Sequence, residues 1–179
     1  RSKEKVAIVR HPDVRRMLML MKSRTEAMRA IACVVAAATD TARCHPDAGL
    51  APVPDGPGRG AYLQWMFHLA NAIQPQLRLW WYPHEAAGEA HREAALEAVQ
   101  RRIEAAWDRI DAHLATQGPF LLGERECVAD YFLTMLMRWS RHMPRPAQTW
   151  PALGALAARM RAKPSFRELH AREGLEEWA

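Results

Sequence analysis

Apolar side chains recur along most of this chain at intervals of three and four residues, the spacing of one face of an α-helix. Turn-forming residues separate six such segments. They run from about Pro12 to His45, Gly60 to Tyr82, Glu85 to Thr116, Val128 to His142, Pro151 to Ala162 and Pro164 to Arg172. No segment keeps the two-residue alternation of a strand for long enough to indicate one. The pattern predicts an all-α fold.

Prolines and glycines mark the boundaries of these segments. His45 precedes Pro46 and ends the first segment, because a residue before proline disfavours the helical conformation. Residues 49–59, GLAPVPDGPGR, have no periodicity and indicate an exposed connector. Pro75 lies inside the second segment and is expected to distort that helix without ending it, whereas Gly118-Pro119 stops the third.

Composition narrows the class of protein. The chain has 179 residues, of which 49% are hydrophobic, as expected for a globular domain with a core of its own. No run is long and apolar enough to span a bilayer, and the first residues lack the apolar centre of a signal peptide. The three cysteines, Cys33, Cys44 and Cys127, form no C-x-x-C pair, which favours a reducing compartment. We expect a soluble cytoplasmic protein that does not bind membranes.

The formal charge of +5 is unevenly distributed. Residues 1–47 hold ten Lys/Arg and five Asp/Glu, which accounts for the whole excess and leaves the remainder neutral. The basic segment has no interleaved aromatics and no recognition motif, so a nucleic-acid partner is not expected. His84 and His91 have no thiolate companions, so no metal site is expected.

Three stretches carry a resemblance to a known family. Residues 118–123, GPFLLG, followed by residues 127–130, CVAD, resemble the loop and helix start at the centre of the glutathione S-transferase C-terminal domain. Residues 62–77, YLQWMFHLANAIQPQL, resemble the first helix of that domain, and residues 150–174, WPALGALAARMRAKPSFRELHAREG, resemble its closing helices. The resemblance covers residues 47–179 and implies a glutathione S-transferase C-terminal-like helical bundle.

The resemblance also implies a structural role for two residues. In the family a Ser or Thr caps the buried helix, and an Asp three residues later closes a capping box around backbone amides that no water can reach. Here Cys127 takes the cap position and Asp130 the later one. A thiol is a weaker acceptor than a hydroxyl. A helix N-terminus can lower a thiol pKa, but free cysteines are usually buried, so we expect Cys127 to be inert.

The first segment resembles a different family. Residues 11–48, HPDVRRMLMLMKSRTEAMRAIACVVAAATDTARCHPDA, are similar to one helix of the C-terminal helical domain of acyl-CoA dehydrogenases, which packs beside a flavin. The resemblance to this family ends after His45-Pro46-Asp47, before the catalytic glutamate of such enzymes would occur. A long Ala/Met/Arg-rich helix can also match by composition alone. The expected domains are residues 1–46, an acyl-CoA dehydrogenase-like segment forming an extra N-terminal helix, and residues 47–179.

For function, the resemblance separates two binding sites. In the family a thioredoxin-like domain holds glutathione, and this chain has no predicted strands and no Glu-Ser dipeptide. We therefore expect no catalytic residue and no cofactor; glutathione is implied by the resemblance alone. The C-terminal domain supplies the wall of the apolar co-substrate site. The candidates are Tyr62, Trp65, Met66, Leu69 and Trp139, although an aromatic stripe at helical spacing also fits a core.

These expectations leave three functional hypotheses. The first is a glutathione S-transferase-family protein without the thioredoxin-like domain and with little or no conjugating activity. The second is a non-catalytic interaction module, a homodimer or a binder of a partner protein, because the first two helices of this domain face the partner subunit in the family. The third is a fused gene fragment without a selected function.

Overall fold

A computed structural model describes residues 13–14, 16–18, 21 and 49–175. The chain divides into two compact units, residues 1–49 and residues 50–179. In the first unit the described residues 13–14, 16–18 and 21 are helical. The rest of the helix predicted from Pro12 to His45, and with it the acyl-CoA dehydrogenase-like segment, lies outside the described residues.

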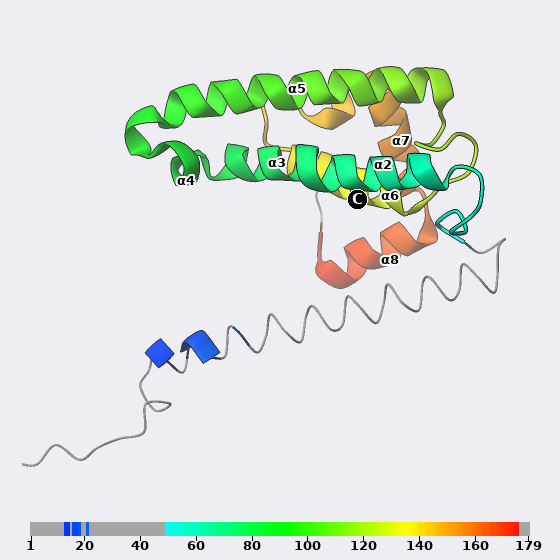
Figure 1. The fold of residues 1–179 in the computed structure, drawn as a ribbon, viewed down its shortest axis with the longest axis horizontal. Helices are drawn as coiled ribbons and strands as arrows, with labels where there is room; N and C mark the ends of the chain where they lie inside the picture. Colours follow the sequence, from blue (N-terminus) through cyan, green and yellow to red (C-terminus); the bar gives the residue numbers. More distant parts are fainter. Residues whose placement is uncertain (1–12, 15, 19–20, 22–48, 176–179) are drawn as a thin grey trace, which may run out of the picture. The chain divides into compact units, whose positions relative to one another are not determined.

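The second unit begins with three helical segments that follow one another without a break: α2 (Arg59–His68), the π-helical segment η3 (Leu69–Ile73) and α3 (Gln74–Trp81) (Figure 1). Pro75 has no amide hydrogen to donate to the preceding turn. The π-helical turn ends at Ile73, two residues before Pro75, and the amide of Gln74 donates to the carbonyl of Leu69. The distortion predicted at Pro75 therefore takes the form of a π segment.

The next helix is shorter than the sequence predicted. The chain forms α4 (Pro83–Ala87), a 3₁₀ turn η4 (Glu89–His91) and the long helix α5 (Arg92–Gln117). The prediction of one helix starting at Glu85 is wrong because Gly88 adopts φ 69°, a left-handed value that only glycine takes readily. From Arg92 onward the predicted helix is confirmed. Its buried stripe is Val99, Ile103, Trp107, Ile110 and Leu114.

The remaining elements are α6 (Val128–Trp139), the 3₁₀ turn η5 (Ala147–Thr149), α7 (Pro151–Arg161) and α8 (Pro164–Glu173). Prolines occupy the first positions of α7 and α8, where their missing amide costs no hydrogen bond. Helix α6 ends at Trp139 and not at the predicted His142. There the Ser140 hydroxyl donates to the carbonyl of Met137 (2.6 Å) and accepts the amide of Ala147 (2.9 Å), which fixes a turn.

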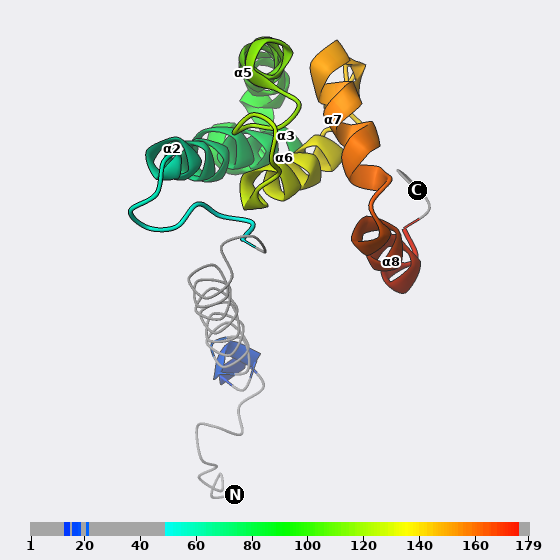
Figure 2. The ribbon, with the colours of Figure 1, turned by 90° about the vertical axis from the view of Figure 1, so that its right-hand side faces the viewer.

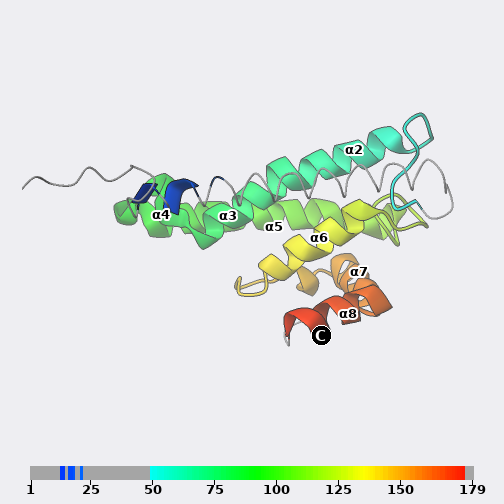
Figure 3. The same cartoon turned by 90° about the horizontal axis from the view of Figure 1, so that it is seen from below.

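These helices pack around one core. Helix α5 packs against α3 and α7, and α6 packs against η3, α2 and α7. Figure 2 shows α8 beyond α7 at the edge of the bundle, and in Figure 3 α6 lies between the α2–α3 stretch and the α7–α8 pair. The core includes one fully buried side chain from each of α5, α6 and α7: Trp107, Leu136 and Leu156. Residues 49–175 contain no strand, so the all-α prediction is confirmed for the described chain.

Candidate functional site

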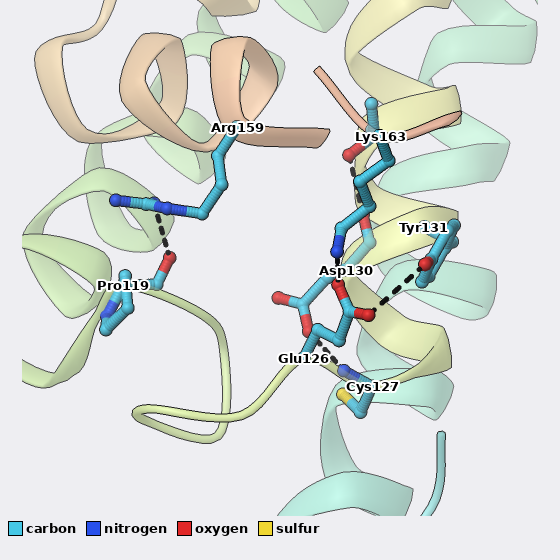
Figure 4. Close-up of polar contacts among 8 residues, drawn as sticks. Pro119, Glu126, Cys127, Asp130, Tyr131, Arg159 and Lys163 are labelled. Atoms are coloured by element: carbon cyan, nitrogen blue, oxygen red, sulfur yellow. Dashed lines mark hydrogen bonds and ion pairs between the residues drawn. The ribbon is translucent and has the colours of Figure 1, made fainter. Parts of the chain in front are cut away.

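The start of α6 is a buried capping centre. The Asp130 carboxylate accepts the amide of Cys127 through Oδ2 at 2.8 Å (Figure 4). It also accepts the amide of Leu121 through Oδ1 at 2.8 Å. The Cys127 thiol in turn accepts the amide of Asp130, which completes a capping box. Asp130 is fully buried. One carboxylate thus fixes both the helix start and the loop that precedes it.

The electrostatics of this centre argue against a reactive thiol. Burial, followed by the charge of Asp130, raises the pKa of the Cys127 thiol to about 12. Burial also raises the pKa of Asp130, although hydrogen bonds from the amides of Leu121 and Cys127 act in the opposite direction. A thiol with so high a pKa stays protonated at neutral pH and is a poor nucleophile.

Polar contacts tie the loop before α6 to the corner between α7 and α8. Lys163 forms an ion pair with Glu126, and the Tyr131 hydroxyl donates to Glu126 Oε1 at 3.5 Å (Figure 4). On the other side of the loop, Arg159 donates to the carbonyl of Pro119 at 3.3 Å. These contacts join the backbone of the loop and charged side chains of α7 and of the corner after it. The α6 start is therefore a structural centre.

The predicted co-substrate residues lie in different surroundings. Tyr62 and Leu69 belong to the core, and Trp65 and Met66 are partly buried against it. The ring of Trp65 lies 4.7 Å from that of His113, centroid to centroid. Of the five candidates, Trp139 alone lines the cavity described next.

A cavity of about 660 Å³ lies between the ends of α3 and α6. Its charged and aromatic lining consists of Arg78, Trp81, Tyr82, Arg138, Trp139 and Arg141. Ala70, Gln74 and Pro75 complete the wall. The indole Nε1 of Trp81 donates to the carbonyl of Trp139 at 3.2 Å, so one hydrogen bond joins the two helices at the cavity. The volume is in the range of cavities that hold drug-sized molecules.

Sequence reasoning missed most of this lining. The signal was present as two short runs in which arginine and aromatic residues interleave: residues 78–82, RLWWY, and residues 138–142, RWSRH. Each run marks the end of a helix. Nothing in either run says that the other lies opposite, because 55 residues of chain or more separate them in the sequence.

Other classes of site find no support in the described residues. Residues 49–175 and the described positions before them contain no group of three or more His, Cys, Asp or Glu side chains arranged to hold a metal ion. Within the same ranges, no helix has both the length and the apolar character needed to cross a bilayer.

Comparisons with known proteins give the family. The family described as "Glutathione S-transferase, C-terminal domain" matches residues 65–164, more than half of the chain. No curated protein matches the sequence significantly. The match starts at residue 65, so the acyl-CoA dehydrogenase resemblance of residues 1–46 stays a prediction.

Solved structures of glutathione transferases are similar over the same region. One from Methylococcus capsulatus strain Bath is 28% identical, with TM-score 0.60, and the match covers 75% of this chain and 63% of that one. One from Xanthobacter autotrophicus Py2 is 28% identical, with TM-score 0.55, covering 66% and 58%. A sphingomonad enzyme complexed with glutathione is 24% identical, with TM-score 0.63, covering 75% and 63%, and supports the fold alone. The chain thus spans less than two thirds of the length of each of these structures. It belongs to the glutathione S-transferase C-terminal domain family.

Proposed function

We propose that residues 50–175 supply the aromatic wall of a transferase co-substrate site and do not conjugate glutathione by themselves. The observation that carries this proposal is the cavity between α3 and α6, with Trp81, Tyr82 and Trp139 in its lining. Flat aromatic surfaces bind planar apolar molecules with little loss of conformational freedom. A co-substrate such as an aromatic electrophile matches this surface.

The absence of conjugation follows from what glutathione activation needs. A free thiol has a pKa near 8.5 and is mostly protonated at neutral pH, so an enzyme must lower that pKa with a donor beside the sulfur. By family resemblance this donor comes from a thioredoxin-like domain, which contains strands. Residues 49–175 form helices and loops without a strand. Their buried thiol, Cys127, takes part in the capping box.

The first experiment measures binding of a neutral aromatic alcohol, 2-naphthalenemethanol, by calorimetry. We expect saturable binding that Ala70→Phe weakens, since Ala70 lines the cavity and the added ring occupies it. Ala105→Phe adds the same ring to an exposed position of α5 and is the matched control. Equal binding by both variants and the unsubstituted protein contradicts a role for the cavity.

The second experiment measures turnover of chlorodinitrobenzene with glutathione. We expect no rate above the uncatalysed reaction for the chain of 179 residues. A rate that depends on the concentration of folded protein contradicts the second half of the proposal.

One observation favours an interaction module as a second function. Leu63 and Phe67 lie four residues apart on α2, hence on one face, and Phe67 is 66% exposed. An exposed aromatic side chain beside a second apolar one suits a protein contact. A sizing column tests this: the chain elutes as a dimer or larger, and Phe67→Lys shifts it to a monomer. Elution as a monomer before substitution excludes self-association through this face.

A further inference from the structure

The cavity between α3 and α6 is strongly basic. Among the residues that the structure describes, Arg78, Arg138 and Arg141 line it, and no aspartate or glutamate does. The carboxylate of Glu85 lies beside this wall, and both of its oxygens accept Arg78 Nη2, at 2.7 and 2.9 Å. The pair is largely exposed, so its attraction is weak and Arg78 remains attractive to a second anion. Arg78 and Arg138 therefore give the cavity wall positive charge.

Arg138 gives the strongest evidence that the cavity binds an anion. Its side chain is half-buried in the cavity wall, and it forms no salt bridge with a carboxylate of the described residues. Its Nε is buried and has no hydrogen-bond partner within the described part of the chain. A guanidinium nitrogen that is withdrawn from water without an acceptor costs free energy, and an anion in the cavity would offset that cost.

Aromatic rings surround the arginines. The Arg78 guanidinium lies 5.1 Å from the centre of the Tyr82 ring, and that of Arg141 lies 5.8 Å from the centre of the Trp81 ring. Such pairs place the guanidinium groups beside aromatic rings. The wall thus offers flat apolar surface and charged donors side by side.

We propose that the cavity selects aromatic anions, namely planar ring systems that carry a carboxylate or sulfonate group. This inference rests on the proposed function and names the substrate class of the same site. The ring packs against Trp81 and Trp139, and the acid group accepts hydrogen bonds from Arg138 and Arg78. Guanidinium groups bind carboxylates and sulfonates through several parallel donors, which gives geometric selectivity as well as attraction.

The test compares three probes with the same ring and different charge: naphthalene-2-sulfonate, 2-naphthalenemethanol and 2-naphthylmethylammonium. Calorimetry on the full chain gives the three affinities. We expect the sulfonate to bind about tenfold more tightly than the alcohol, and the ammonium most weakly, on the usual scale of hydrogen bonds to charged groups. Added salt should weaken the sulfonate more than the alcohol, because it screens charge and leaves ring packing intact.

Two variants locate the selectivity. Arg138→Gln should lower the ratio of sulfonate to alcohol affinity by about tenfold. Glu85→Gln removes the carboxylate that competes for Arg78 and should raise the same ratio by about threefold, without loss of a lining side chain. Glu85 is exposed, so Glu85→Gln should fold normally. Its affinity ratio therefore tests the selectivity even if Arg138→Gln does not fold. Arg101→Gln, at an exposed position of α5 paired with Glu97, is the matched control.

The outcomes separate the inference from the proposed function. Equal affinities for sulfonate and alcohol, unchanged in Arg138→Gln and Glu85→Gln, overturn the selectivity and leave an aromatic site. Failure of both probes to bind, or binding that Ala70→Phe does not weaken, overturns the proposed function itself. A charge preference that Arg101→Gln also reduces belongs to the general surface charge and overturns the assignment to this cavity.

Discussion

At the scale of single residues, Asp130 joins the start of α6 to the loop that precedes it. Its two carboxylate oxygens accept amides from two different places, Leu121 in the loop and Cys127 at the start of α6. All of these groups are buried, so water cannot replace the carboxylate. Loss of the acid leaves two backbone donors without acceptors.

Asp130→Ala is therefore expected to lower the free energy of unfolding by about 2–4 kcal/mol, since each buried donor left without a partner costs about 1–3 kcal/mol. Urea unfolding followed by circular dichroism measures this. Asp130→Asn keeps one acceptor oxygen and should lose less, and Asp55→Ala in the exposed connector should be neutral. A loss below about 0.5 kcal/mol for Asp130→Ala contradicts the capping role.

Cys127→Ser is expected to be neutral or stabilising by up to about 1 kcal/mol, because a hydroxyl accepts the amide of Asp130 better than a thiol does. The pH dependence gives a second readout. Burial raises the pKa of the Cys127 thiol to about 12 in the folded chain, above the value near 8.5 of an unfolded thiol. The stability that depends on the protonated Cys127 thiol is therefore fully present below about pH 8.5 and is lost as the pH rises toward 12.

Between pH 8 and pH 10 the unsubstituted chain should lose about 2 kcal/mol more stability than Cys127→Ser. The measurement is a urea denaturation series at each pH. Equal losses in the two proteins would mean that the thiol ionises as easily in the folded chain as in the unfolded one, and Cys127 would again be a candidate nucleophile.

At the scale of elements, α7 obtains its cap from another helix. The residue before it, Trp150, has no side-chain acceptor, and Asp111 on α5 accepts the amides of Ala152 and Leu153 at 2.7 and 2.9 Å. Beside it, Asp108 accepts the indole Nε1 of Trp150 at 2.7 Å. Two carboxylates of α5 thus position the start of α7, and a negative charge there also suits the helix dipole.

Asp111→Ala should lower the free energy of unfolding by about 1–2 kcal/mol, the usual scale for the loss of a helix cap. Asp111→Asn retains an acceptor and should lose less. Thermal unfolding compares the two. An Asp111→Ala protein as stable as the parent would show that water replaces the carboxylate at this helix start.

Several of these elements could be predicted from sequence because their signals are local. The prolines at residues 151 and 164 fix the starts of α7 and α8, and the apolar stripe of α5 repeats at helical spacing. Gly88 was missed, because a glycine inside a periodic segment fits a helix almost as well as a break. The Asp111 cap could not be foreseen, since its acceptor and donors are 41 and 42 residues apart.

At the scale of the whole domain, the candidate site forms because the ends of α3 and α6 lie opposite each other, which the sequence alone does not show. The stripe of Tyr62 and Leu69 indicated buried side chains, but burial against the core and burial against a ligand give the same periodic pattern. Trp139 belongs to the cavity because the end of α6 lies opposite the end of α3. The family could be inferred from local motifs, whereas the cavity required the fold.

Saturation-transfer nuclear magnetic resonance on the full chain, with an equimolar mixture of glutathione and 2-naphthalenemethanol, tests the proposed function most directly. We expect transfer to the naphthyl protons, reduced in Ala70→Phe and retained in Ala105→Phe, and no transfer to the methylene protons of glutathione. Transfer to glutathione that S-hexylglutathione suppresses would contradict the claim that this chain binds an aromatic co-substrate without a glutathione site.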